Sequence, residues 1–187
     1  MDLTECIKMF YEQPFQSKEA VILISDHIQA GTASILSLIE ALHDKITSID
    51  TDDRKNMCAL LQSVLNVLPS RQLDAREVTV LCEFFCSKLK DHYSIHPPVL
   101  GCLHKLSLSG HMSAKCADEI VVTLFQEVQV QACFQTVRTI VYEMLANLLD
   151  KFPAVFVKMG DDFIYNFTKN VEGLYFYHSL YLFYIKL

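Results

Sequence analysis

Residues 74–108 read DAREVTVLCEFFCSKLKDHYSIHPPVLGCLHKLSL, and this stretch predicts two helices folded back on each other. Asp74 is a favourable N-cap residue, and Glu77 stands where a capping box needs an acidic side chain. Apolar side chains then recur at helical spacing: Val78, Leu81, Cys82, Phe85 and Leu89. This stripe predicts a helix with one buried face.

A turn at residues 91–94 separates this helix from a second one. Pro97 and Pro98 favour a helix start, because the first N–H groups of a helix have no partner inside it. A second apolar stripe follows, made by Val99, Cys102, Leu103 and Leu106. A hairpin of this kind cannot bury both stripes alone, so we expect similar hairpins on either side of it.

The rest of the chain has the same pattern. Helices are expected at residues 2–12, 17–30, 34–46, 51–68, 113–128 and 134–148, with a last short one from residue 160. The first helices of successive pairs begin near Ser34, Asp74, Ser113 and Gly160. Their spacing of roughly 40 residues is typical of HEAT and armadillo arrays. We therefore predict an all-α, HEAT/armadillo-like α-solenoid of about three to four helical-hairpin repeats.

Two segments make up the predicted organisation. The array covers residues 1–173, with pairs near 34–68, 74–108 and 113–150 and a partial repeat from residue 160. Residues 174–187 read LYFYHSLYLFYIKL, an apolar tail too short for a bilayer, which takes about 20 residues. We interpret the tail as the divergent end of a truncated or alternatively spliced chain. A membrane or partner contact is the alternative.

Composition narrows the class of protein. Of the 187 residues, 51% are apolar, which argues against disorder. The net charge is −6 and no Lys/Arg cluster appears, so we expect no direct contact with nucleic acid. The start, Met1–Glu5, is acidic where a signal peptide is basic. Seven cysteines without framework spacing then indicate reduced thiols in the cytosol or nucleus.

Cysteine and histidine residues raise the alternative of a zinc protein. Cys82 and Cys86 are followed by His92 and His96, but both cysteines fall about one turn apart on one predicted helix, where Cys82 belongs to the core stripe. The other thiols are spread over different helices: Cys6, Cys58, Cys102, Cys116 and Cys133. A cluster needs several converging thiolates, so we predict no metal and no cofactor.

Catalytic patterns are weak as well. The chain has no G-x-S-x-G segment, no P-loop and no glycine-rich phosphate cradle. Cys116 with His111, or Cys102 with His104, could be drawn as a dyad, but each pair is more simply two neighbours on a helix. Paired carboxylates at residues 52–53 and 161–162 suit helix N-termini electrostatically without any catalytic role. We predict that the chain is not an enzyme.

Several segments, in this order, resemble one family. They are Lys88–His92, Pro98–Leu100, Lys105–Leu108, Leu124–Gln131, Val137–Arg138, Val141–Tyr142 and Gly160–Phe163. This series resembles the N-terminal region of the MMS-nineteen family of large HEAT-repeat proteins, from about residue 17 to residue 173. Arg54 and Arg138, early in two second helices, look like the Asp/Arg pattern of HEAT inner helices, where such side chains can satisfy polar groups between repeats.

The resemblance implies a scaffold of the targeting complex for cytosolic iron–sulfur protein assembly. Members of the family bring a WD40 propeller protein and a small MIP-type protein to apo-proteins such as DNA-repair helicases, polymerases and primase. Those assembly partners dock on C-terminal repeats of the much longer family protein, which are absent here. Family members occur in cytoplasm and nucleus, and some at the mitotic spindle. These partners and locations are expectations for this chain.

The resemblance and the charge pattern together suggest where a partner could bind. We predict surface contacts at Lys88, Lys90, Asp91 and His92, on the inter-helix turn, and at Asp161 and Asp162. Two alternatives stay open. One is a generic HEAT-repeat adaptor in transcription, repair or transport with no iron–sulfur role, and the other is the Cys/His zinc protein.

Overall fold

The computed structural model describes residues 1–69 and 72–158. Ten α-helices lie in these ranges: α1 (Leu3–Glu12), α2 (Ser17–Gln29), α3 (Ile35–Ala41), α4 (His43–Ile46), α5 (Thr51–Val67), α6 (Ala75–Lys88), α7 (His96–Ser107), α8 (Ala114–Glu127), α9 (Gln135–Lys151) and α10 (Pro153–Val157). Three short 3-10 helices precede α2, α7 and α9: η1 (Pro14–Gln16), η2 (Tyr93–Ile95) and η3 (Val130–Ala132). The described ranges contain no strand, and the all-α prediction is confirmed.

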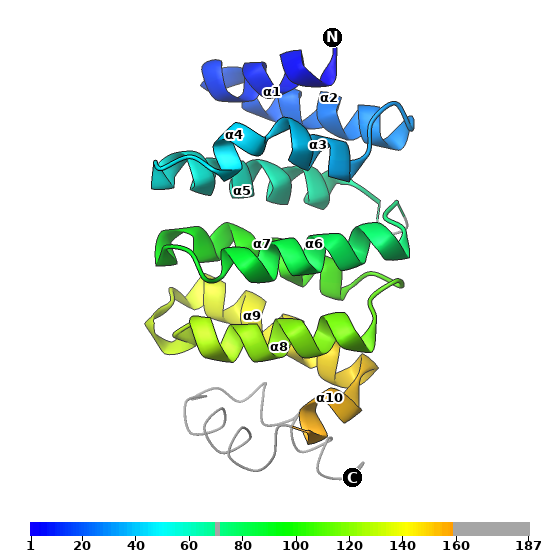
Figure 1. Cartoon of the computed structure of the whole chain (residues 1–187), viewed down its shortest axis with the longest axis vertical. Helices are drawn as coiled ribbons and strands as arrows, with labels where there is room; N and C mark the ends of the chain where they lie inside the picture. Colours follow the sequence, from blue (N-terminus) through cyan, green and yellow to red (C-terminus); the bar gives the residue numbers. More distant parts are fainter. Residues whose placement is uncertain (70–71, 159–187) are drawn as a thin grey trace.

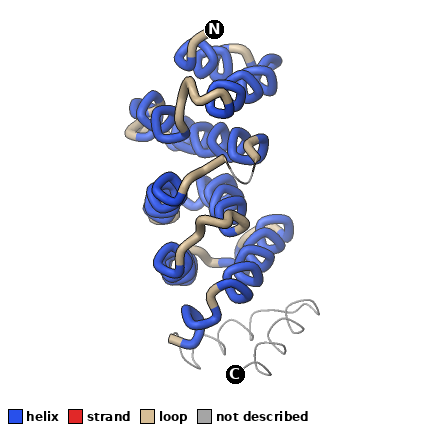
Figure 2. Tube along the Cα trace, turned by 90° about the vertical axis from the view of Figure 1, so that its right-hand side faces the viewer, coloured by secondary structure: helices blue, strands red, loops and turns tan. Residues whose placement is uncertain are grey.

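The helices are stacked in two layers along the long axis of the molecule (Figures 1 and 2). One layer holds α1, α3 with α4, α6 and α8, and the other holds α2, α5, α7 and α9. Within the second layer each helix contacts the next, and α6 contacts α8 in the first. The arrangement is an α-solenoid of antiparallel pairs, as predicted.

Local signals at helix starts match the caps seen in the structure. The Glu77 amide donates to Asp74 Oδ1 at 2.8 Å, and the Asp74 amide donates to Glu77 Oε2 at 3.1 Å, which completes the predicted capping box. Asp2 and Glu5 form the same arrangement at α1. Gly31, at φ +72°, turns the chain after α2, a conformation that glycine adopts without strain.

Three details differ from the expected boundaries. The single helix expected over residues 34–46 is broken at Leu42, whose ψ of 9° ends α3 before α4 begins. The break leaves Leu42 buried and brings Lys45 Nζ within 2.9 Å of Asp53 Oδ1, so tertiary contacts override the local pattern. α5 ends at Val67, one residue before its expected end, and α7 begins one residue before the proline pair.

Some predicted features lie outside the described residues. These are the short helix from residue 160, the boundary of the array at residue 173 and the tail at 174–187. Before them, the short helix α10 begins at Pro153, and it is not among the expected helices. No helix among the described residues is long and apolar enough to cross a membrane.

The core runs between the two layers without interruption. The predicted stripes of the central hairpin are buried, with Phe85 and Leu81 fully inaccessible on α6 and Val99 and Leu103 on α7. A close approach of α5 and α7 occurs at Gly101, where a Cβ atom would collide with the Gln62 side chain. The pairs therefore share one core, and each pair completes the burial of its neighbours.

Polar side chains also join each pair to the preceding one. Gln72 Nε2 donates to the Ile28 carbonyl at 3.2 Å, and Lys151 Nζ donates to the Ser107 carbonyl at 2.8 Å. In both bonds the donor lies 44 residues after the acceptor. The acceptors lie in the last turns of α2 and α7, where carbonyls have no partner inside the helix. Capping between repeats thus supplements apolar packing.

Truncation of the core should destabilise the whole stack. Leu124 is fully buried on α8, and we expect Leu124→Ala to lower the free energy of unfolding by about 2–5 kcal/mol. Leu108→Ala is the matched control, because Leu108 is exposed, and its effect should stay within about 0.5 kcal/mol. Urea unfolding followed by circular dichroism measures both. Equal stability of the two variants would contradict the core assignment.

Candidate functional site

A forked ion pair joins the second and third helix pairs. Arg54, in the first turn of α5, donates from Nε to Asp91 Oδ2 at 2.8 Å and from Nη2 to Asp91 Oδ1 at 2.9 Å. Its Nη1 donates to the carbonyls of Ser48 and Ile49 at 2.7 and 2.9 Å. The planar guanidinium fits a carboxylate in this way and holds it in one orientation. The ion pair therefore fixes the α6–α7 turn against the α4–α5 turn.

Each side chain of this ion pair shifts the pKa of the other. The Arg54 guanidinium holds the pKa of Asp91 below its ordinary value of 3.8, and the backbone N–H of His92, 2.7 Å from Oδ1, acts in the same direction. The carboxylate in turn raises the pKa of Arg54. The two side chains are 16% and 20% exposed, so solvent screens the pair only in part. The predicted role of Arg54 between repeats is confirmed.

Arg138 occupies the same position in α9 as Arg54 does in α5, the fourth residue of the helix. The described residues supply no carboxylate to it. The predicted role of Arg138 between repeats therefore stays a prediction.

The structure separates the predicted partner contacts into two kinds. Asp91 is held by Arg54, and Lys88 Nζ donates to the Ile46 carbonyl at 3.4 Å, so both serve the junction between repeats. Lys90 and His92 are exposed and project from the same turn. The other two, Asp161 and Asp162, lie outside the described residues.

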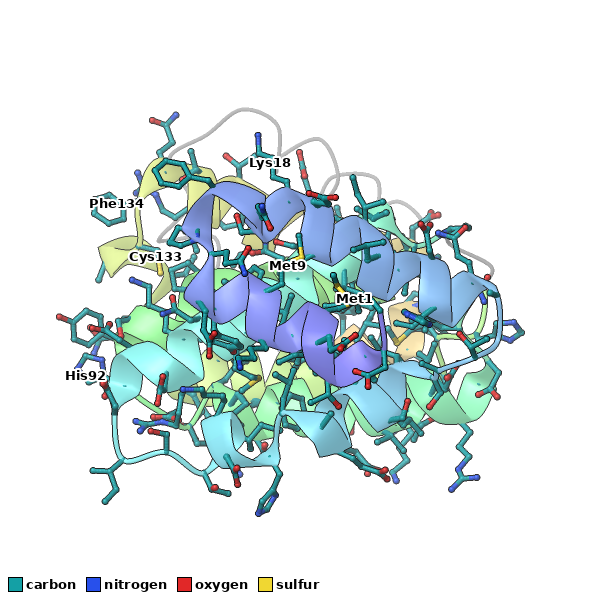
Figure 3. All side chains as sticks on the ribbon, turned by 90° about the horizontal axis from the view of Figure 1, so that it is seen from above. Met1, Met9, Lys18, His92, Cys133 and Phe134 are labelled. Atoms are coloured by element: carbon teal, nitrogen blue, oxygen red, sulfur yellow. The ribbon has the colours of Figure 1, made fainter. Side chains whose placement is uncertain are left out.

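Exposed apolar side chains on the turns were not predicted. Tyr93 lies against His92, with ring centroids 4.3 Å apart, and remains 74% exposed. Figure 3 shows His92 and Phe134 at the same end of the helix pairs, pointing away from the core. Our sequence reasoning followed helical stripes and so missed single apolar residues between helices. Such residues recur at each of the described first-to-second-helix turns, as Phe15, Ile49, Tyr93 and Phe134, and this recurrence was the available signal.

The candidate metal ligands do not converge. His92 Nδ1 lies 2.9 Å from Ser94 Oγ at the surface, while His96 is buried with Nε2 3.0 Å from the Leu89 carbonyl. Cys82 and Cys86 are buried, and burial raises the pKa of the Cys86 thiol to about 12 and that of Cys82 further. Among the described residues no three His, Cys, Asp or Glu side chains could hold a metal ion.

The two candidate dyads are not assembled either. Cys116 Sγ accepts from Ser113 Oγ at 3.1 Å, and His111 is exposed in the preceding turn. Cys102 is fully buried with its thiol 3.9 Å from the Cys58 carbonyl on α5. His104 instead faces α9, with Nε2 3.7 Å from Glu143 Oε2. The thiols and imidazoles therefore belong to packing and helix contacts.

Comparison with known proteins identifies the family. The family model described as "Dos2-interacting transcription regulator of RNA-Pol-II", MMS19_N, matches residues 39–173, which is most of the chain. The chain belongs to this family. It is 35% identical over 151 residues to a protein of Danio rerio named "MMS19 nucleotide excision repair protein homolog", covering 80% of the chain and 14% of that relative.

Other MMS19 relatives agree. The Xenopus tropicalis homolog is 32% identical over 162 residues, covering 87% of the chain and 15% of the relative, and the human homolog is 29% identical over 150 residues, covering 80% and 14%. The chain thus spans about one seventh of the length of these MMS19 relatives. Arg54, Asp91 and the exposed turn residues Lys90, His92 and Tyr93 all fall inside the segment that the MMS19_N model matches.

Removal of the Asp91 charge should weaken the junction in a pH-dependent way. Because the folded pKa is lowered, the carboxylate stabilises the fold above its ordinary pKa, and this contribution is lost as the pH falls through the folded value. We expect Asp91→Asn to lower the free energy of unfolding at pH 7 by about 0.5–1 kcal/mol. The difference from wild type should shrink below pH 3.8.

Urea titrations at several pH values measure this difference. Asp44→Asn is the control, because Asp44 is exposed and makes no ion pair with another described residue. A constant difference between Asp91→Asn and wild type from pH 7 down to pH 3 would refute the electrostatic role of the pair.

Proposed function

We propose that this chain is a non-enzymatic scaffold segment that binds partner proteins in DNA repair, transcription and iron–sulfur protein maturation. The observation that carries this proposal is the stack of helix pairs, most of which lies inside the segment that the MMS19_N model matches, residues 39–173. Solenoids of this kind present extended surfaces built from successive repeats, and partners bind across several of them. The names of the relatives refer to nucleotide excision repair, and the family description refers to transcription.

The rigid junction at Arg54 supports a binding role for the turns. Because Asp91 is fixed by two charge-assisted bonds, Lys90 and His92 leave the turn from a defined backbone position. Preorganised side chains lose less freedom on association, which favours binding. The turn between α6 and α7 therefore suits a partner contact better than a mobile loop would.

The specific function that we propose is client presentation in the targeting complex of cytosolic iron–sulfur assembly. The clients are apo-proteins such as repair helicases and DNA polymerases. A WD40 propeller protein and a MIP-type protein are partners of the full-length family protein. We expect the chain in the cytoplasm and the nucleus, with a fraction at the mitotic spindle. No membrane contact and no direct nucleic-acid contact form part of the proposal.

A generic HEAT adaptor is the second candidate, because the fold alone would serve transport or kinase scaffolds equally well. The two candidates differ in the proteins that they bind. Affinity capture with the full chain from cytosolic extract, under replete and depleted iron, followed by mass spectrometry, separates them. Enrichment of iron–sulfur apo-proteins under depletion supports client presentation. Capture of other partners alone favours the generic adaptor.

A charge reversal tests the predicted contact surface. We expect Lys90→Glu to reduce client capture at least threefold at unchanged helicity, because Lys90 is exposed and has no carboxylate partner among the described residues. Arg76→Glu is the matched control, because Arg76 is also exposed, makes no ion pair with another described residue and lies in the first turn of α6, at the opposite end of that helix from Lys90. Quantitative capture of both variants gives the measurement. Equal capture would remove the α6–α7 turn from the binding surface.

A further inference from the structure

The four most exposed large apolar side chains of the described residues share one structural position. Phe15, Ile49, Tyr93 and Phe134 are 104%, 99%, 74% and 84% exposed. Each lies on the turn that joins the first helix of a pair to the second, just before α2, α5, α7 or α9. These turns follow one another along one side of the stack, at the left in Figure 1. We call these four residues the turn edge.

Single exposed apolar residues need no explanation, but a regular series does. A turn tolerates polar residues at no cost to the core, so four successive large apolar side chains are not required by folding. Aromatic residues, together with arginine, supply most of the energy of protein interfaces. The turn edge therefore has the composition of a binding surface.

The charges near Tyr93 and Phe134 indicate the kind of partner. Lys88, Lys90 and Arg138 stand within five residues of these two rings. The acidic residue within five residues of these rings is Asp91, and its carboxylate is already ion-paired with Arg54. Glu127, half-buried at the end of α8, is the nearby carboxylate without a cation in the described part of the chain. This half of the edge is therefore locally positive on a chain whose net charge is −6.

Spacing indicates the conformation of the partner. Stacked helices lie about 8–10 Å apart, so successive turns repeat at about that distance. A segment in the polyproline II conformation advances about 3.1 Å per residue with three residues per turn, so every third residue lies on the same face and meets the next turn. Apolar residues at that interval would contact Tyr93 and Phe134 in turn, and acidic residues between them would meet Lys90 and Arg138.

We propose that the turn edge around Tyr93 and Phe134 binds an extended acidic segment of a partner protein that carries an apolar anchor at every third residue. Ile49 and Phe15 lie outside this site, because the turn of Ile49 carries the exposed carboxylates of Asp50 and Asp52. The inference rests on the proposed function, because it names the surface by which the scaffold takes a protein partner.

A fluorescent peptide of four Phe-Glu-Glu units is the probe for the full chain. We expect it to bind with a dissociation constant on the order of 10–100 μM, and Tyr93→Ser with Phe134→Ser to weaken binding at least tenfold. Lys90→Glu with Arg138→Glu should weaken it by a similar factor at low salt and less at high salt. Ile22→Ser with Leu108→Ser is the control, because both residues are exposed and lie away from the edge, and binding should not change.

Two control peptides and one hydrodynamic measurement complete the test. Phe-Lys-Lys units and Ser-Glu-Glu units should each bind at least tenfold more weakly than Phe-Glu-Glu units. Equal binding of Phe-Lys-Lys, no binding of Phe-Glu-Glu to wild type, or full binding to the serine variant would overturn the proposal. Concentration-dependent dimerisation that the serine variant abolishes would also overturn the proposal, because a second copy of the chain would then be what binds the turn edge.

The outcomes separate this inference from the proposed function. If wild type and the serine variant capture iron–sulfur clients equally, the turn edge is not the binding surface, while the proposed scaffold function is supported. If the acidic peptide binds as expected while no such client is captured, the surface stands and the client class is wrong.

Discussion

Each helix pair of this chain leaves an apolar stripe that only the next pair can cover. The stripe of α6 is buried by α7 within its own pair and by α8 of the next, and α7 is covered in turn by α5 and α9. Stability is therefore a property of neighbouring pairs and cannot be assigned to one of them. The layers, the continuous core and the placement of the described first-to-second-helix turns along one side of the stack follow from this requirement.

Apolar packing alone leaves the position of one helix pair on the next loosely defined. Polar bonds between repeats restrict that position. Arg54 binds Asp91 in a forked geometry that has one good arrangement, and Lys151 reaches the carbonyl of Ser107 only when α9 lies in register with α7. Such bonds contribute little free energy where they are partly exposed. Their effect is to select one stacking from several that would bury similar area.

Sequence reasoning predicted the features that depend on local chemistry. The Asp74–Glu77 capping box, the buried stripe through Phe85 and the repeat period could be read directly, because caps and helical spacing are properties of short segments. The break at Leu42 could not, since it depends on contacts with a later helix. The partner of Arg54 is Asp91, 37 residues away along the chain. A polar partner between repeats was predicted, but the residue that supplies it was not. The exposed turn residues were overlooked because they belong to no stripe.

The capping bonds between repeats have a direction along the chain. Gln72, Lys88 and Lys151 each satisfy a carbonyl that precedes them by 42 to 44 residues. During synthesis on the ribosome, the carbonyl at the end of an earlier helix therefore has no side-chain partner until the donor, about one repeat later in the chain, has been synthesised. At roughly 5–20 residues per second, that interval is about 2–9 seconds. During this interval the newest pair is structurally incomplete, so a pause in translation at a repeat boundary would prolong its exposure to chaperones.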